Sequence, residues 1–146
     1  MASQTQLETL IDLARRETDD AAKRLGAALK AASEAEEKLN MLLGYRDEYG
    51  KRFDETQQQG ITPMAYRNFQ AFMAKLDTAI QGQRDIVQHM QQRGALEKSS
   101  WQAAERKRMS YSTLRDRAVA QQQKVEAKRD QKAMDEHASR QAFFKR

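Results

Sequence analysis

The segment QQQGITPMAYRNF, residues 57–69, contains the only proline of this 146-residue chain. Gly60 can take the left-handed backbone conformation that closes a helix, and Thr62 is a suitable N-cap for the next one. Pro63 fits the first turn of that helix, where its missing N–H costs nothing. The segment therefore predicts a helix over about residues 5–58, a turn over about 59–62 and a second helix over about 63–140.

Apolar residues repeat at alternating spacings of four and three on both sides of this turn. Twelve of fourteen such positions are apolar in the first half, and nine of fourteen in the second. The first series is Leu7, Ile11, Ala14, Thr18, Ala21, Leu25, Ala28, Ala32, Ala35, Leu39, Leu42, Arg46, Tyr49 and Phe53. The second is Phe69, Met73, Leu76, Ile80, Gln83, Val87, Met90, Gly94, Glu97, Trp101, Ala104, Arg108, Tyr111 and Arg115. Such a repeat, with so short a loop, predicts an all-α fold: a long two-helix antiparallel coiled coil, or α-hairpin.

A chain that folds back at Gly60 brings residues together whose numbers sum to about 121 or 122. This register sets Trp101 against Ala21 and Met90 against Ala32, so that large side chains meet small ones. At about 1.5 Å per residue, the second helix extends about 115 Å and the first about 80 Å. We therefore expect a single coiled-coil domain, residues 1–146, in which residues from about 117 to 146 form an unpaired overhang.

Composition narrows the class of protein. No apolar run is long enough for a membrane span, and the N-terminus has no signal-peptide pattern, so we expect a cytosolic protein. The chain has no cysteine, which excludes disulfides and thiolate metal sites. Residues 1–83 carry 11 Lys and Arg against 13 Asp and Glu, a net charge of −2, and residues 84–146 carry 15 against 8, a net charge of +7. The basic second half predicts an acidic partner.

No catalytic or metal-binding pattern is present. His89 and His137 stand alone, with no second histidine four residues away. Neighbouring carboxylates, such as those of Asp19 and Asp20, point to different faces of a helix, and a two-helix hairpin has almost no concave interior. We expect a protein that is not an enzyme and that holds no metal or cofactor.

Nucleic-acid or membrane-surface binding is the alternative reading of the basic half. The residues concerned are Arg106, Lys107, Arg108, Lys128 and Arg129, with Trp101 and Tyr111 nearby. Acidic residues are mixed among them. Trp101 falls on the expected seam, the row of repeating apolar positions along which the two helices would pack. This mixture favours a solvated helix face or a protein-docking surface over nucleic acid, but a basic coiled-coil adaptor that binds nucleic acid or an anionic membrane surface stays open.

Apolar residues near the turn exceed what one seam can cover. Two rows face each other in the expected register: Leu42, Tyr45 and Tyr49 on the first helix, and Phe72, Leu76 and Ala79 on the second. We call these six residues the shelf. A partly exposed apolar shelf on a thin coiled coil indicates a docking site, but a small rotation of the helices would instead bury it. The pattern alone leaves both readings open.

Several segments together carry a resemblance to a known family. They are LETLIDLARRETDDAAKRLG at 7–26, AEEKLNMLLGYRDEY at 35–49, NFQAFMAKLDTAI at 68–80, SW at 100–101 and RDQKAMDEHASR at 129–140. In this order and spacing the chain resembles the FliJ family of flagellar export proteins over nearly its whole length. Each piece alone is typical of coiled coils, whereas the ordered combination is specific.

The resemblance implies a non-enzymatic component of the bacterial flagellar type III protein export apparatus. It implies a coiled coil similar to the central stalk of rotary ATPases, which binds the export ATPase hexamer, promotes its assembly and activity, and links it to the export gate. Further implied properties are escort of export chaperones, a role in flagellum biogenesis, motility and chemotaxis, and a cytoplasmic location. The chain would be a monomer when free, would bind no nucleic acid, and would be peripheral to the inner membrane at the flagellar base.

The resemblance also assigns residues. The gate-binding surface of the family carries over onto Leu42, Tyr45, Tyr49, Phe72, Leu76 and Ala79, which are the shelf. Lys38 and Gln83 depart from the glutamine and histidine expected at the polar rim of that surface. For the ATPase ring we expect contacts from Arg15, Arg16, Arg24, Lys124, Lys128, Arg129 and Lys132.

Overall fold

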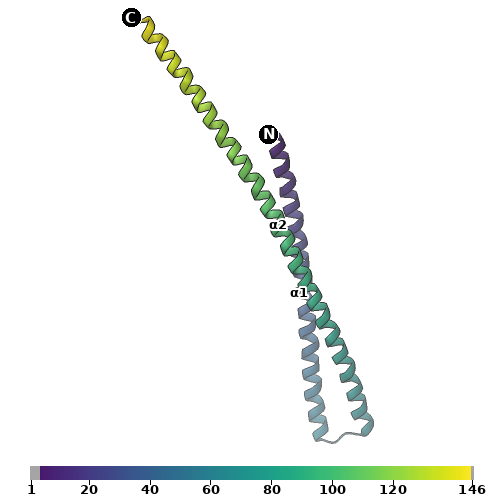
Figure 1. Ribbon diagram of the computed structural model, residues 1–146. Helices are drawn as coiled ribbons and strands as arrows, with labels where there is room; N and C mark the ends of the chain where they lie inside the picture. Colours follow the sequence, from purple (N-terminus) through teal and green to yellow (C-terminus); the bar gives the residue numbers. More distant parts are fainter. Residues whose placement is uncertain (1–3, 146) are drawn as a thin grey trace. The chain divides into compact units, whose positions relative to one another are not determined.

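A computed structural model describes residues 4–145 of the chain, which form two helices and no strand. Helix α1 spans Gln4–Gln58 and helix α2 spans Pro63–Phe144. The helices pack against each other as an α-hairpin coiled coil, so the predicted fold class is confirmed (Figure 1). The second helix continues four residues beyond the expected end at about residue 140.

The turn between the helices has the local chemistry that the sequence predicts. Gly60 has a φ of 92°, a left-handed value that L-residues with a side chain rarely adopt. The backbone N–H of Gly60 donates to the carbonyl of Gln57 at 3.0 Å and closes α1. The Thr62 hydroxyl accepts from the N–H of Ala65 at 3.1 Å, which makes Thr62 the N-cap, and Pro63 is the first residue of α2.

Contacts divide the chain into two units, and each is described by itself. The turn unit comprises residues 20–101, and the terminal unit comprises residues 4–19 and 102–145. The prediction of a single domain over residues 1–146 stays a prediction, and residues 1–3 and 146 lie outside the described residues.

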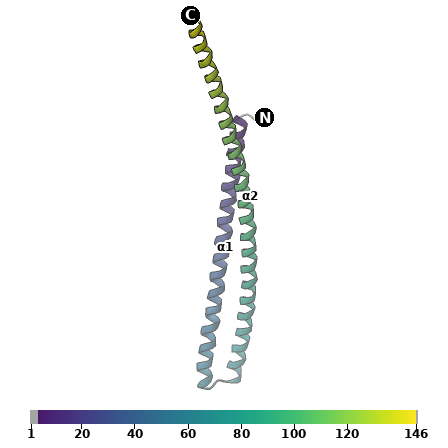
Figure 2. The ribbon, with the colours of Figure 1, turned by 60° about the vertical axis from the view of Figure 1, so that its left-hand side comes forward.

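In the turn unit the two helices lie side by side and antiparallel (Figure 2). The rings of Phe53 and Phe69 stack with centroids 3.6 Å apart, and those of Tyr49 and Phe72 lie 4.4 Å apart. These pairs have residue numbers that sum to 122 and 121, so the predicted register is correct here. The core is asymmetric because α1 contributes small residues and α2 larger ones. Its buried apolar members are Ala21, Ala28, Ala32, Ala35, Leu76, Ile80 and Val87.

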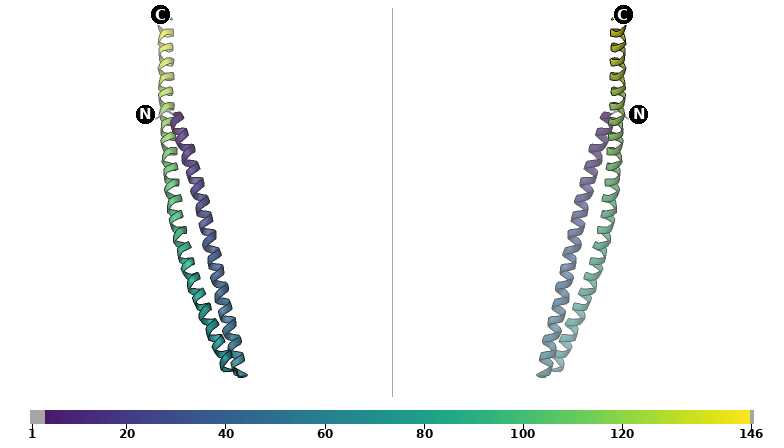
Figure 3. Two further views of the ribbon diagram at one scale, coloured as in Figure 1. Left: turned by 90° about the vertical axis from the view of Figure 1, so that its right-hand side faces the viewer. Right: turned by 90° about the vertical axis from the view of Figure 1, so that its left-hand side faces the viewer.

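In the terminal unit the first turns of α1 pack against α2 through Ile11, Ala14 and Thr18, all buried. The Thr18 hydroxyl donates to the carbonyl of Ala14 at 2.9 Å, which satisfies this polar group inside the seam. Helix α2 then continues past the start of α1 (Figure 3). Ala118 and Val119 are still half-buried, whereas every residue from 120 to 145 is exposed. We call residues 120–145 the C-terminal arm.

Candidate interaction surfaces

The shelf divides into exposed and buried members. Tyr45 is 54% exposed, Phe72 45% and Tyr49 36%, whereas Leu76 is only 9% exposed and belongs to the core. Leu42 is half-buried and Ala79 is exposed. The packing of the helices therefore buries Leu76 but leaves the three aromatic side chains at the surface, and the docking role of the shelf stays a prediction.

The exposed aromatic residues of the shelf border a hollow. Tyr45, Tyr49, Phe72 and Leu76 line it together with Glu48 and Arg52, and its volume is about 230 Å³. We call it the shelf hollow. Its apolar floor is the core residue Leu76, and its walls are aromatic rings. This arrangement provides a place for one apolar side chain of a partner, with charged groups at the edge.

Gln83, expected at the polar rim of the shelf, lies instead in the core. It is 5% exposed, and its side-chain N–H donates to the carbonyl of Ala35 across the seam at 3.0 Å. The glutamine at this position therefore takes part in the packing of the two helices. A polar residue at a seam position was the sequence signal for this bond. Lys38, the other departure, is exposed.

In the turn unit, an ion pair that the sequence did not reveal joins α1 and α2. The guanidinium of Arg46 donates to the Asp77 carboxylate of the other helix at 2.6 Å. This hydrogen bond is the main reason why the pKa of Arg46 is raised above its ordinary value. Arg46 occupies a seam position, and the pair explains how a cation is accommodated there. Both side chains are about half exposed, so the pair contributes little stability.

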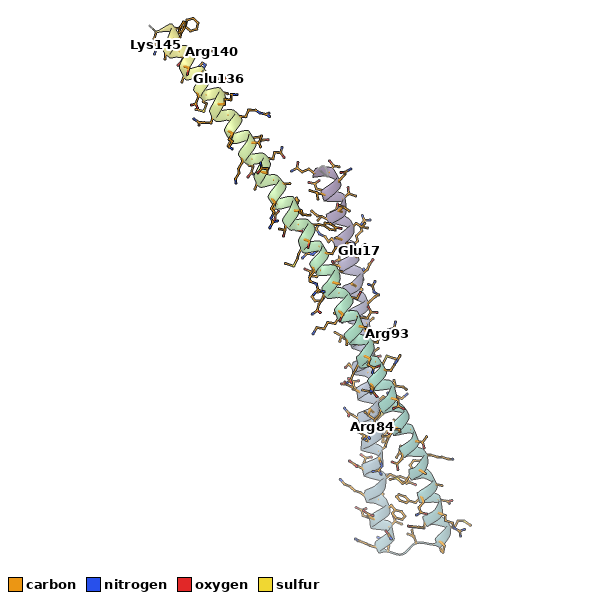
Figure 4. All side chains as sticks on the ribbon, in the orientation of Figure 1. Glu17, Arg84, Arg93, Glu136, Arg140 and Lys145 are labelled. Carbon is orange, nitrogen blue, oxygen red and sulfur yellow. The ribbon has the colours of Figure 1, made fainter. Side chains whose placement is uncertain are left out.

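The cations expected to contact an ATPase ring are all exposed, but they fall in different parts of the chain. Lys124, Lys128, Arg129 and Lys132 lie on the C-terminal arm, and Arg15 and Arg16 lie on the first turns of α1 in the same unit. Figure 4 shows Glu136, Arg140 and Lys145 farther along the arm. Arg24 lies in the turn unit, where its side chain forms an ion pair with Glu97 at 3.4 Å.

In the terminal unit, one cation of the basic half, Arg108, is held by an ion pair. Arg108 donates to both carboxylate oxygens of Glu105, and both side chains are half-buried. The hydrogen bond from Arg108 is the main reason why the pKa of Glu105 lies below its usual value. Because Arg108 is paired and Trp101 is half-buried, neither presents the free cation or aromatic platform that nucleic-acid binding needs.

Residues 4–145 contain no helix with an apolar stretch long enough to cross a membrane. Nor does this part of the chain contain a group of three or more His, Asp or Glu side chains that could bind a metal ion.

Comparison with known proteins gives the family. The family model described as "Flagellar FliJ protein" matches residues 3–146. The chain belongs to the FliJ family. It is 37% identical to the flagellar FliJ protein of Salmonella typhi over 145 residues, with 99% of each chain covered. It is 34% identical to the flagellar FliJ protein of Escherichia coli strain K12, again over 145 residues and 99% of each chain. The family identified from the sequence is thus confirmed.

Proposed function

We propose that the chain is a non-enzymatic component of the flagellar type III protein export apparatus, which binds the export ATPase hexamer and links it to the export gate. The family match over residues 3–146 carries this proposal. The two-helix fold supports it, because a coiled coil offers surfaces for partners and no enclosed active site. In this proposal the chain also escorts export chaperones and acts in the cytoplasm at the flagellar base.

For the ATPase contact we infer a role for the C-terminal arm, together with Arg15, Arg16 and Arg24. The arm carries six Lys and Arg residues against four Asp and Glu, and all of its residues are exposed. An isolated helix with so little apolar surface is marginally stable, and a partner with acidic groups would hold it in place. Catalysis would belong to the ATPase, and the arm would act by binding.

The experiment measures ATP turnover of the purified export ATPase with increasing amounts of the chain. We expect the wild-type chain to raise turnover and to promote hexamer formation. A variant with Lys124, Lys128, Arg129 and Lys132 changed to Gln should need a concentration on the order of tenfold higher to reach the same stimulation. The reason is that it loses four exposed ion pairs with the ATPase, each contributing roughly 0.3 to 0.5 kcal/mol. No stimulation by saturating wild-type chain would contradict the proposal.

A matched control removes two other exposed arginines. Arg84 and Arg93 lie on α2 in the turn unit (Figure 4) and make no ion pair among residues 4–145. Changing both to Gln lowers the net charge without touching the arm. This control should stimulate the ATPase as the wild type does. An equal loss per charge removed in the two variants would mean that only total charge matters.

For the gate contact we infer a role for the shelf: Leu42, Tyr45, Tyr49, Phe72, Leu76 and Ala79. Phe72→Ala should weaken binding of the cytoplasmic domain of the gate protein by about tenfold or more, as expected for an aromatic residue at the centre of an interface. Leu96→Ala is the control, because Leu96 is an exposed apolar residue outside the shelf. Leu76→Ala should also weaken binding. Because it removes a core side chain, its affinity is compared with that of the wild type only if both proteins have the same helicity. Equal affinities for Phe72→Ala and Leu96→Ala would argue against the shelf.

The alternative is a basic adaptor that binds nucleic acid or an anionic membrane surface. It predicts a different result in a binding experiment. Its binding to a DNA duplex or to anionic vesicles would fall steeply with salt concentration.

A further inference from the structure

A second hollow lies next to the shelf, at the turn of the hairpin. Phe53, Ile61, Ala65 and Phe69 supply most of its lining, and its volume is about 200 Å³. We call it the turn hollow. Both hollows are smaller than the roughly 300 Å³ at which small-molecule sites begin, so each suits a side chain of a partner protein.

Two residues, Tyr49 and Arg52, line both hollows. The ring of Tyr49 stacks on Phe69 with centroids 5.4 Å apart and also contacts Phe72. Contact with these two rings holds the side chain of Tyr49 in place, as a ridge between the hollows. The turn hollow is therefore continuous with the shelf along one side of the turn unit.

Arg52 is an exposed cation at this ridge, and no ion pair joins it to any acid among residues 4–145. Its backbone carbonyl accepts from the Thr56 hydroxyl, which leaves the guanidinium uninvolved. Glu48, one helical turn away, lines the shelf hollow on the same side. An unpaired guanidinium between two apolar hollows is complementary to a carboxylate flanked by apolar side chains.

We propose that the interface with the gate partner extends beyond the shelf to the turn, and that the partner segment bound there pairs an acidic side chain with Arg52 and places one apolar side chain in each hollow. This inference rests on the proposed gate contact of the shelf. It adds Arg52 as a specificity-determining residue and Ile61 as an apolar contact. The carboxylate of Glu48 repels the acidic side chain of the partner, so removing the charge of Glu48 favours binding.

The experiment measures the affinity of the purified full-length chain for the cytoplasmic domain of the gate protein, at about 0.05 M and about 0.5 M salt. At low salt, Arg52→Gln weakens binding by about three- to fivefold, the upper range for an exposed ion pair, and Glu48→Gln strengthens it by about twofold. At high salt both differences disappear. Ile61→Ala weakens binding by about fivefold at both salt concentrations, because the lost contact is apolar.

Lys51→Gln is the matched control, since Lys51 is an exposed cation adjacent in sequence that lines neither hollow. Equal effects of Arg52→Gln and Lys51→Gln overturn the proposal. If Phe72→Ala still weakens binding in that case, the shelf contact stands and only its extension to the turn is wrong. If the wild-type chain does not bind the gate domain, the proposed gate contact and this extension both fail.

Discussion

Replacing Gln83 tests how the two helices are held together. Gln83→Ala removes the hydrogen bond to the carbonyl of Ala35 and one buried methylene group. A net hydrogen bond contributes about 1 kcal/mol and a buried methylene about 0.8 kcal/mol, so the free energy of unfolding should fall by about 2 kcal/mol. For a chain of this size, such a loss lowers the Tm by about 4 to 8 °C.

Urea unfolding followed by far-UV circular dichroism measures this loss as a lower midpoint at an unchanged slope. Gln88→Ala is the matched control, because Gln88 is exposed and alanine is the better helix former. A third variant, Gln83→Leu, keeps most of the side-chain volume. It leaves no orphaned group, since the Ala35 carbonyl is also bonded within α1, and should lie within about 1 kcal/mol of the wild type. Equal stability of Gln83→Ala and Gln88→Ala would refute the reasoning.

Three further predictions concern the turn and the terminal unit. Gly60→Ala should destabilise the chain by about 1 kcal/mol in urea unfolding, because φ is 92° at this position. Gly82 has open space around it in the middle of a helix, so Gly82→Ala should stabilise the chain by about 0.5 to 1 kcal/mol. A stabilised Gly60→Ala variant would contradict this reasoning. Thr62→Ala removes the N-cap of α2 and should cost about 1 kcal/mol in the same measurement, and an unchanged midpoint would mean that solvent caps the helix equally well. Because Arg108 lowers the pKa of Glu105, the stability from this pair is present above the ordinary glutamate pKa of about 4.3 and is lost as pH falls through the lower folded value. Glu105→Gln should therefore reduce the loss of thermal stability on acidification, and an identical pH profile would count against the pair.

Much of the fold follows from local sequence. The closing Gly60, the capping Thr62 and the leading Pro63 act through their own backbone geometry, so their roles can be predicted without tertiary information. The short loop likewise predicted the antiparallel pairing, and its position at Gly60 predicted the register. The ring contacts of Phe53 with Phe69 and of Tyr49 with Phe72 confirm that register.

The candidate sites were less predictable. Leu76 and Phe72 lie one helical turn apart on the same row, yet packing buries the first and exposes the second. The hydrogen bond from Gln83 to the Ala35 carbonyl joins residues 48 positions apart in the sequence. Arg108 was placed from the sequence both on the seam and among the candidate phosphate contacts, and it pairs with Glu105, three residues earlier on the same helix.

By itself, then, the sequence determined where the chain turns, which residues form the seam and which family the chain belongs to. These features depend on the backbone preferences of single residues, on the spacing of apolar residues and on residue identity, all of which can be read from the sequence without knowing which residues are in contact. Only the tertiary structure decided which flank of the seam is exposed and where Arg52 lies relative to the hollows. The physical reason is that the rotation of each helix about its own axis is set by how small and large side chains of the two helices fit together.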